Sequence, residues 1–509
     1  MDFAKFTEKV LGRLFRYTTS LMWPVCSGLL LGLGSILPEF GFFVWFGLVP
    51  LFIFLNSKEV SVRRAFKGGY LAGLIFLSHV FAWSFDAWPL NWLGIDNKIL
   101  ALFLVIFLWM ILIGFLALFF GFFSLAYRQC RRKGIAMLLA APALWIVFEY
   151  ARSWGLGILL AGKESLLGPH WTFGNLAYLL AQNQSARWLA SYGGIYLISF
   201  LVVLINVLFF LYFKKSKKIV FSIAILILLS YFLPIGTNTR EGVFTKVAVL
   251  QTNFPSVLRL DRETELARFQ LQRNLIQGIE DVDILVLPEN ANFLSQPAAR
   301  DTLNQLTDQE FFVVDSEKTV AILYDIKKGS VDHYQKMLLV PYGDYFPYFL
   351  EWSGNLINEG WVERIKEKRG RQKGEVLSRQ GILFCSEAIS PLLYRQTRQQ
   401  GADILFNLGS LAFARGSKIL DSQTQAMLQM RAAENGAYLI RSTNFGTSYI
   451  IDRTGKIIKK TSNTENQILL GEIVQNQQKT LYTEYGDWIL AAALLGLTFS
   501  AIYIIMKQE

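Results

Sequence analysis

Eight long apolar runs divide the 509-residue chain, and they constrain its fold more than any other feature. A helix that crosses a lipid bilayer needs about 20 mostly apolar residues. The runs of roughly this length are Thr19–Leu37, Gly41–Leu55, Phe66–Phe85, Ile99–Tyr127, Ile135–Ala151, Tyr192–Phe213, Ile219–Ile235 and Trp488–Met506. Any one of them could be a buried core helix, but eight in one chain predict a polytopic α-helical membrane protein.

The composition supports this prediction. The chain is 53% hydrophobic and 17% charged, whereas soluble globular proteins average roughly 45 to 50% apolar and about 25% charged residues. These values exclude a disordered chain, and three cysteines, Cys26, Cys130 and Cys385, exclude a disulfide scaffold.

Lysine and arginine collect in every second connection between the apolar runs. Such clusters mark short cytoplasmic loops, so the N-terminus is expected in the cytoplasm and the segment after the seventh run outside it. The clusters lie at 5–16, 58–67, 128–133 and 214–218. They account for much of the net charge of +11, so the charge requires no nucleic acid partner.

The topology therefore predicts three parts in a cell inner membrane protein. They are a membrane domain over 1–235 with about seven helices, an extracytoplasmic, periplasmic domain over 236–487, and a C-terminal transmembrane helix over 488–509. About 250 residues are enough for the middle part to form its own core.

In the middle part, short β-rich runs alternate with polar stretches that suit helices. This alternation favours an α/β domain with buried strands. Strands are expected at Lys246–Gln251, Asp283–Leu287, Thr319–Leu323, Ile382–Phe384, Ile404–Asn407 and Tyr438–Ser442, and helices at Arg259–Ile279 and Gln423–Asn435.

Three of the expected strand ends carry reactive side chains. Glu289 follows Asp283–Leu287, Lys336 precedes an apolar stretch, and Cys385 ends Ile382–Phe384 with Glu387 close behind. Each alone has an ordinary explanation: a surface carboxylate, a lysine that extends to water, or an inert buried cysteine.

Together, these residues match the needs of acyl transfer through a cysteine. Such a site needs a nucleophilic sulfur, a general base or acid, and a cation that stabilises the thiolate or the oxyanion. Glu289, Lys336 and Cys385 can supply all three.

In this chain order the three residues resemble the Glu-Lys-Cys triad of nitrilase-like carbon-nitrogen hydrolases. More narrowly, the chain resembles the bacterial apolipoprotein N-acyltransferases over essentially its full length, including the order of the membrane runs. The matching segments are Leu287–Glu289, Lys336 with Leu339–Pro347, Cys385–Glu387 and Arg441–Gly446, with weaker support from Glu149, Arg152, Tyr482, Gly486 and Asp487.

The resemblance implies an α-β-β-α sandwich and a two-step, ping-pong reaction. Cys385 would take an acyl chain from a phospholipid as a thioester, with Glu289 as general base and Lys336 as the oxyanion- and thiolate-stabilising cation. The α-amino group of the N-terminal diacylglyceryl-cysteine of an apolipoprotein would then accept the chain. Asp344 and Glu387 would support the site, and no cofactor or metal is implied.

The chain also departs from the family pattern near the triad. Asp344 stands where the family usually has glutamate, Ser386 where it has tyrosine, and Gly409–Phe413 replaces an Asn-Asp-Ala-Trp-Phe-like segment. Two alternatives therefore stay open: a membrane-tethered amidase with the same triad, and a non-catalytic lipoprotein-binding scaffold.

Other polar residues point to no further chemistry. His79, His170 and His333 are scattered without partners at metal-ligand spacing, and His333 is expected to be structural. Glu149 and Arg152 lie three residues apart on one helix face, where they could pair or seat a lipid head group. No glycine-rich phosphate loop is present, which disfavours an ATP-driven transporter.

Overall fold

The computed structural model describes most of the chain, in several separate segments. These segments are 19–130, 136–214, 243–257, 261–306, 311–328, 331–351, 381–462, 465–475 and 478–506. The seventh predicted run, 219–235, and the basic residues of 5–16, 131–133 and 215–218 lie outside the described residues.

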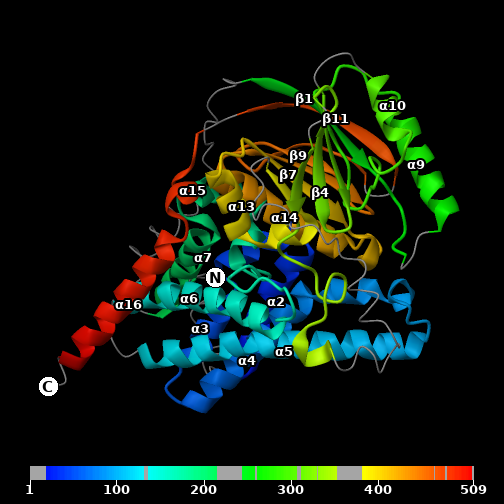
Figure 1. Cartoon of the computed structure of the whole chain (residues 1–509). Coiled ribbons are helices and arrows are strands. Elements are labelled where there is room, and N and C mark those ends of the chain that lie inside the picture. Colours follow the sequence, from blue (N-terminus) through cyan, green and yellow to red (C-terminus); the bar gives the residue numbers. More distant parts are fainter. Residues whose placement is uncertain are drawn as a thin grey trace, which may run out of the picture.

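The apolar runs that the structure describes form a helical half of the molecule (Figure 1). Figure 1 shows helix α16 projecting away from this half, with its C-terminal end remote from the sheets. The helices are α2 (Met22–Ile36), η2 (Pro38–Trp45), α3 (Val49–Leu55), α4 (Val62–Val80), α5 (Lys98–Cys130), α6 (Ala136–Leu159), α7 (Gln184–Lys214) and α16 (Trp488–Met506).

Three of the described helical segments are long and apolar enough to cross a membrane. They are Pro38–Leu55, Lys98–Gln129 and Gln184–Leu211, and Met22–Ile36 and Trp488–Phe499 are shorter apolar helices. Helix α5 exposes Ile99, Phe103 and Met110, which would be unfavourable against water. Such exposed apolar side chains fit a membrane protein, in which this surface of α5 would contact lipid.

The second predicted run is not one continuous helix. The 3-10 helix η2 and the short helix α3 replace it, with Pro50 in the first turn of α3. Proline fits the first turn because it has no N–H to donate there. Gly41 also packs so closely that an added Cβ would lie 2.0 Å from the Leu179 carbonyl oxygen. Packing against neighbouring segments therefore determines the conformation of this segment more than its hydropathy does.

Two mixed β-sheets form the other half of the molecule. The first has the order β11-β1-β2-β3-β4-β5, and the second has the order β10-β9-β8-β7-β6. In each, three neighbouring strands are parallel: β1, β2 and β3 in the first sheet, and β6, β7 and β8 in the second.

The strand bounds follow the chain through both sheets. The first sheet consists of β1 (Phe244–Gln251), β2 (Ile284–Val286), β3 (Phe312–Glu317), β4 (Val320–Asp325), β5 (Val331–Gln335) and β11 (Gln467–Val474). The second consists of β6 (Ile382–Phe384), β7 (Ile404–Ser410), β8 (Tyr438–Asn444), β9 (Tyr449–Ile451) and β10 (Ile457–Lys460).

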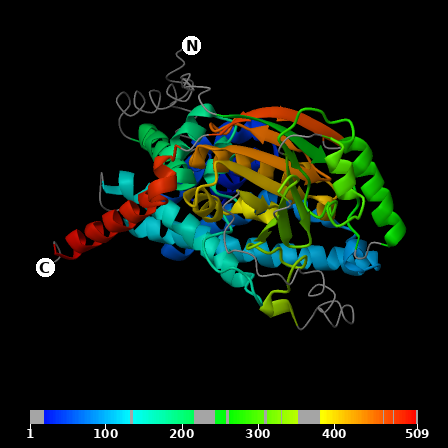
Figure 2. The same cartoon turned by 45° about the horizontal axis from the view of Figure 1, so that its top comes forward.

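The two sheets pack face to face, with helices on both outer faces. Val249 and Val286 of the first sheet share a buried cluster with Phe406 and Ile440 of the second. Helices α9 (Arg262–Ile276) and α10 (Ala299–Asn304) cover the outer face of the first sheet, as Figures 1 and 2 show. The predicted α-β-β-α sandwich is therefore confirmed.

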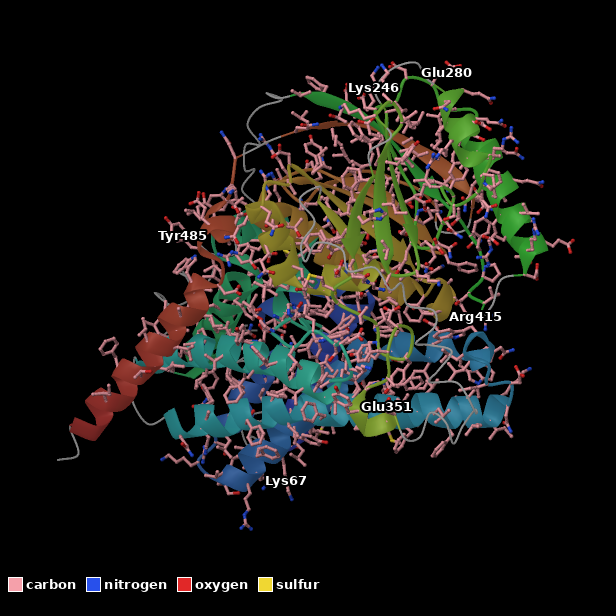
Figure 3. All side chains as sticks on the ribbon, in the orientation of Figure 1. Lys67, Lys246, Glu280, Glu351, Arg415 and Tyr485 are labelled. Atoms are coloured by element: carbon pink, nitrogen blue, oxygen red, sulfur yellow. The ribbon has the colours of Figure 1, made fainter. Side chains whose placement is uncertain are left out.

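The second sheet's outer face joins the two halves of the molecule. Helices α13 (Pro391–Gln399) and α14 (Lys418–Asn435) cover this face. The buried side chains between them and the sheet belong to the same apolar core as those of the membrane helices. Helix α14 thus lies between sheet and membrane helices. Figure 3 shows Lys67 of α4 at one end of the molecule, and Lys246 and Glu280 of the sandwich at the other.

Each strand and helix predicted in the sandwich is present, within a few residues of the expected bounds. The sequence prediction omitted β3, β5, β9, β10 and β11 and helices α10, α13 and α15 (Leu481–Tyr485). Strand β3 contains the buried polar residues Asp315 and Ser316, which weaken its apolar signal. Strand β10 is largely exposed, so its side chains do not form the apolar alternation of a half-buried strand.

The buried carboxylate of Glu434 connects α14 to helix α7. Arg431 Nε lies 2.8 Å from Glu434 Oε2, and both side chains are fully buried. Helix α7 breaks at Gly193 and Gly194, and the Ile195 N–H that follows the break donates to Glu434 Oε1 at 3.0 Å. Glu434 therefore caps the second part of a membrane helix from within the sandwich.

Replacing Glu434 with alanine is expected to destabilise the whole chain. The change leaves the buried Arg431 guanidinium without its carboxylate, and breaking a buried pair in this way costs about 3 to 5 kcal/mol. Thermal unfolding in detergent should show a clearly lower midpoint for Glu434→Ala, and an unchanged midpoint for the exposed control Glu484→Ala. Equal midpoints for the two variants would contradict this role.

Candidate active site

Lys336 lies buried between two carboxylates. Its Nζ atom is 2.9 Å from Glu289 Oε1 and 3.0 Å from Asp344 Oδ2, and the residue is 4% exposed. Lys336 directly follows β5, where its own N–H donates to the Thr319 carbonyl at 2.8 Å. Two of the predicted site residues and one predicted supporting residue therefore form a single charge cluster.

Asp344 reaches Lys336 although its side chain is one methylene shorter than glutamate. A tight turn brings it close: the Asp344 N–H donates to the Val340 carbonyl, and the Val340 N–H donates to Asp344 Oδ2, both at 2.8 Å. Tyr342 inside this turn has a φ of 64°. The turn geometry thus compensates for the shorter carboxylate.

The end of β3 holds the segment that carries Glu289. The Leu287 N–H donates to the Val314 carbonyl at 2.9 Å, and the Asn290 N–H donates to the Ser316 hydroxyl at 3.0 Å. Asn290 has a φ of 60°, a left-handed conformation that asparagine tolerates better than most residues. The chain therefore turns sharply after β2, and Glu289 lies against Lys336.

Cys385 begins the 3-10 helix η7 (Cys385–Ile389), directly after β6. Its thiol is 3.7 Å from the Ser410 carbonyl oxygen at the end of β7, and the ring centroid of the preceding residue, Phe384, is 5.6 Å from Lys336 Nζ. The structure thus brings together all three residues that the sequence predicts for the triad.

Burial controls the charge states in this cluster. Burial raises the pKa of Glu289, and the Lys336 ammonium opposes that rise. Burial alone would lower the pKa of Lys336, but the carboxylates of Asp344 and Glu289 outweigh it and raise that pKa. Burial also raises the pKa of the Cys385 thiol. The site therefore combines a fixed cation, a carboxylate of raised pKa and a thiol that keeps its proton at rest.

Glu387 connects the segment that carries Cys385 with the segment that follows Lys336. It is fully buried, and its Oε1 atom accepts from the Tyr334 hydroxyl at 2.8 Å and the Met337 N–H at 2.7 Å. Its Oε2 atom accepts from the Phe384 N–H at 2.5 Å. Glu387 therefore fixes β6 and the start of η7 against the segment that follows Lys336.

Ser386 is buried, and its hydroxyl donates to the Leu338 carbonyl. The residue that departs from the family pattern beside the nucleophile thus adds another bond between the same two segments.

Two aromatic residues that the sequence prediction did not include pack against the same small apolar cluster as Cys385. Cys385, Trp83 and Phe413 pack against one small cluster around Leu411. Trp83 comes from η3 (Ala82–Ala87) in the helical half of the molecule. Its ring centroid is 6.3 Å from that of Phe413. The residues are far apart in the sequence, and only Phe413 lies in the segment flagged as unusual.

The other polar candidates lie elsewhere. His333 is exposed on β5. Glu149 and Arg152 both contact the loop after α6: Glu149 Oε1 accepts from the Leu176 N–H at 3.0 Å, and Arg152 Nη2 donates to Asn175 Oδ1 at 2.9 Å. These bonds fit the structural interpretation better than a lipid site.

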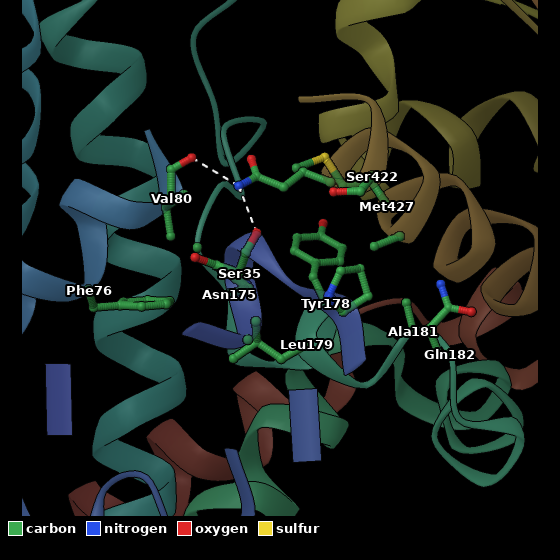
Figure 4. A pocket seen from close by; sticks show the side chains of 15 residues that line it. Ser35, Phe76, Val80, Asn175, Tyr178, Leu179, Ala181, Gln182, Ser422 and Met427 are labelled. Carbon is green, nitrogen blue, oxygen red and sulfur yellow. Dashed lines mark hydrogen bonds between the residues drawn. The ribbon is translucent and has the colours of Figure 1, made fainter. Parts of the chain in front are cut away.

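A small pocket of about 50 Å³ lies between the two halves of the molecule, and none of Glu289, Lys336 and Cys385 lines it. Figure 4 shows residues from α2, α4, the loop after α6 and α14 around it, with the side chain of Gln423 bonded to the carbonyls of Ser35 and Val80. This pocket lies where α14 meets the membrane helices.

Removing the Glu387 carboxylate is expected to disrupt the site. Glu387→Ala leaves the Tyr334 hydroxyl and several N–H groups buried without their acceptor, and each such loss costs about 1 to 3 kcal/mol. Acyl transfer and the unfolding midpoint should both fall sharply, whereas the exposed control Glu280→Ala should change neither. A stable, fully active Glu387→Ala protein would show that this carboxylate does not position the loops.

Comparison with known families gives two matches in chain order. The apolipoprotein N-acyltransferase N-terminal domain matches residues 27–208, and the carbon-nitrogen hydrolase domain matches residues 319–481. The two matches together cover more than half of the chain.

Curated relatives named apolipoprotein N-acyltransferase match across most of their length. The protein of Geobacter metallireducens is 25% identical, with 95% of both chains covered. That of Pseudomonas aeruginosa strain PAO1 is 27% identical over 75% of this chain and 78% of its own. That of Rickettsia prowazekii is 26% identical over 70% of this chain and 73% of its own.

Two solved structures show partial similarity to this chain. An amidase from Nesterenkonia sp. AN1 is 19% identical, covers 49% of this chain and 96% of its own, and has a TM-score of 0.32. A carbon-nitrogen hydrolase from Helicobacter pylori is 15% identical over 45% of this chain and 89% of its own, with a TM-score of 0.32. From the two family matches and the curated relatives, the chain belongs to the apolipoprotein N-acyltransferase family, a membrane-bound branch of the carbon-nitrogen hydrolases.

Proposed function

We propose that this enzyme transfers an acyl chain from a phospholipid, through a thioester on Cys385, to the α-amino group of the N-terminal diacylglyceryl-cysteine of apolipoproteins. The observation that carries the proposal is the buried cluster of Glu289, Lys336 and Asp344 beside Cys385. Membership of a family named for this activity supports the choice of substrates.

In the first half-reaction the Cys385 sulfur attacks the carbonyl carbon of a phospholipid ester. The Glu289 carboxylate takes the thiol proton as the S–C bond forms, and Lys336 stabilises the negative oxygen of the tetrahedral intermediate. The ester C–O bond then breaks, and the leaving glyceryl oxygen takes the proton from Glu289. The products are the thioester and a lysophospholipid.

In the second half-reaction the neutral α-amino group attacks the thioester carbonyl. Glu289 takes a proton from the amine, the C–S bond breaks, and the sulfur regains a proton as the amide forms. Asp344 would keep Lys336 charged in both steps, because it stays paired with the ammonium whenever Glu289 is protonated.

Transfer to an amine requires that water be kept from the thioester. Trp83 and Phe413 beside Cys385 provide an apolar wall, and Trp83 belongs to the membrane half. This arrangement favours a lipid-borne acyl chain at the site over an amidase that hydrolyses a soluble amide.

The placement in the cell is part of the proposal. The chain would lie in the cell inner membrane with a multi-pass domain over 1–235, its N-terminus in the cytoplasm. The catalytic domain over 236–487 would lie in the periplasm, followed by the membrane helix over 488–509. The loop charges support this orientation.

Incubation with phospholipid alone should leave an acyl mass on Cys385. Peptide mass spectrometry of the detergent-solubilised protein should find a hydroxylamine-labile adduct that is missing in Cys385→Ala. Adding a diacylated lipopeptide should discharge the adduct and give an amide. An adduct that decays equally fast in water would instead identify a hydrolase, and no adduct with any lipid would favour the scaffold alternative.

The acylation step should depend on pH through Glu289. Only the ionised carboxylate can take the thiol proton, so the acylation rate should rise as pH rises through the pKa of Glu289, which burial places above the usual glutamate range. Glu289→Gln should slow acylation by about 10²- to 10⁴-fold, measured by rapid quench and mass spectrometry.

Asp344→Asn should shift this rise of the acylation rate to lower pH. The Asp344 carboxylate raises the pKa of Glu289, so its removal lets Lys336 hold Glu289 ionised at lower pH. If the acylation rate rises over the same pH range in Asp344→Asn, or still rises with pH in Glu289→Gln, another group causes the pH dependence.

A further inference from the structure

We propose that Arg441 is a positioning residue whose buried guanidinium stabilises the ionised Cys385 sulfur during the reaction, a task that the resemblance gives to Lys336. This inference rests on the proposed acyl transfer through Cys385. It assigns separate roles to two cations: Lys336 stabilises the acyl oxygen and Arg441 stabilises the sulfur.

Arg441 is linked to the nucleophile through strand β7. It lies on β8 opposite Asn407 of β7, and its Nη1 atom donates to Asn407 Oδ1 at 2.6 Å. Asn407 Nδ2 in turn donates at 2.9 Å to the carbonyl of Phe384, the residue before Cys385. A short chain of hydrogen bonds therefore connects the guanidinium to the backbone that carries the thiol.

Gly409 allows the guanidinium to lie close to the end of β7. A Cβ atom added at Gly409 would be 2.8 Å from Arg441 Nη2 and 2.9 Å from its Cζ, so only glycine leaves the guanidinium its space. The next residue, Ser410, supplies the carbonyl that the Cys385 thiol contacts. The positive charge therefore packs against the strand end that touches the sulfur.

Among the residues that the structure describes, no ion pair balances the charge of Arg441. The residue is fully buried, and its Nε and Nη2 atoms have no hydrogen-bond partner among the described residues. Within these described segments, no carboxylate lies within ion-pair distance of the Arg441 guanidinium. Burying an uncompensated charge is costly, and a thiolate at Cys385 would supply the missing negative charge.

Lys336 is a weaker candidate for this task because two carboxylates already neutralise it. Glu289 and Asp344 lie within 3.0 Å of its Nζ atom, so the cluster of three carries a net negative charge when both acids are ionised. Such a cluster opposes the formation of a second anion at the sulfur. Only when Glu289 is protonated does the cluster become neutral.

The other groups around the two residues leave Arg441 as the main opposing cation. Cys385 is influenced by Glu289, Lys336 and Arg441, and Arg441 lowers the pKa of the thiol more than Lys336 does. Around Arg441, the acidic groups are Asp421 of α14 and the hydroxyls of Tyr449 and Tyr394. Asp421 is engaged by Thr447, whose hydroxyl donates to its Oδ2 atom at 2.6 Å.

The test is the pH dependence of Cys385 alkylation in the full-length protein in detergent. Iodoacetamide reacts with the thiolate, and peptide mass spectrometry separates Cys385 from Cys26, which is exposed. Arg441→Gln should raise the alkylation midpoint by about one pH unit, which lowers the rate about tenfold at a fixed pH below it. Arg441→Lys, which keeps the charge, should restore most of the rate.

Two further variants keep the test decisive if Arg441→Gln does not fold. Gly409→Ala keeps the arginine but displaces its guanidinium, so it should also raise the midpoint. Arg398→Gln removes another fully buried arginine, one that pairs with Asp403, and should leave the midpoint unchanged. Wild-type midpoints in every folded Arg441 and Gly409 variant, or an equal shift in Arg398→Gln, would overturn the inference.

Alkylation needs no lipid, so this test separates the inference from the proposed function. A shifted midpoint in a protein that never forms an acyl adduct would refute the acyl transfer and leave the Arg441–Cys385 coupling intact. An acyl adduct that forms with an unshifted midpoint in Arg441→Gln would refute the coupling alone.

Discussion

The burial of Lys336 between Glu289 and Asp344 is the interaction on which the rest of the site depends. A lone ammonium inside a sandwich of two sheets would lose its proton or unfold its surroundings. Two carboxylates at 2.9 and 3.0 Å keep it charged. These three residues come from different segments, after β2, after β5 and from the turn that follows, so the cluster exists only when these segments lie against one another.

The nucleophile reaches this cluster from the second sheet. Cys385 follows β6, and Glu387 binds the segment after Lys336 to the start of η7. The second sheet in turn rests on α14, which is fixed to the membrane helices through Glu434 and Ile195. The packing that builds the site is therefore continuous with the packing that holds the domain at the membrane helices.

Much of this could be predicted from the sequence, since buried strands and long apolar helices leave strong local patterns. The proximity of Glu289, Lys336 and Cys385 was predictable because Glu289 and Cys385 follow clear strand signals and Lys336 lies in a recognisable motif. The roles of Glu387 and Asp344 in positioning were only partly predictable, because they depend on backbone N–H groups whose placement no side-chain pattern records. The aromatic contact of Trp83 with Phe413 was not predictable, because it joins segments more than 300 residues apart. The break between η2 and α3 was missed because hydropathy does not register close backbone packing at Gly41.

The central claim is that one site performs acyl transfer with Cys385 as nucleophile and Lys336 as the cation for the acyl oxygen. An experimental structure of the protein trapped after incubation with phospholipid, without acceptor, tests it most directly. The account predicts density for an acyl chain continuous with the Cys385 sulfur, its carbonyl oxygen within hydrogen-bond distance of the Lys336 ammonium and its tail along Trp83 and Phe413. An acyl chain bound elsewhere, or a thioester whose oxygen points away from Lys336, would contradict it.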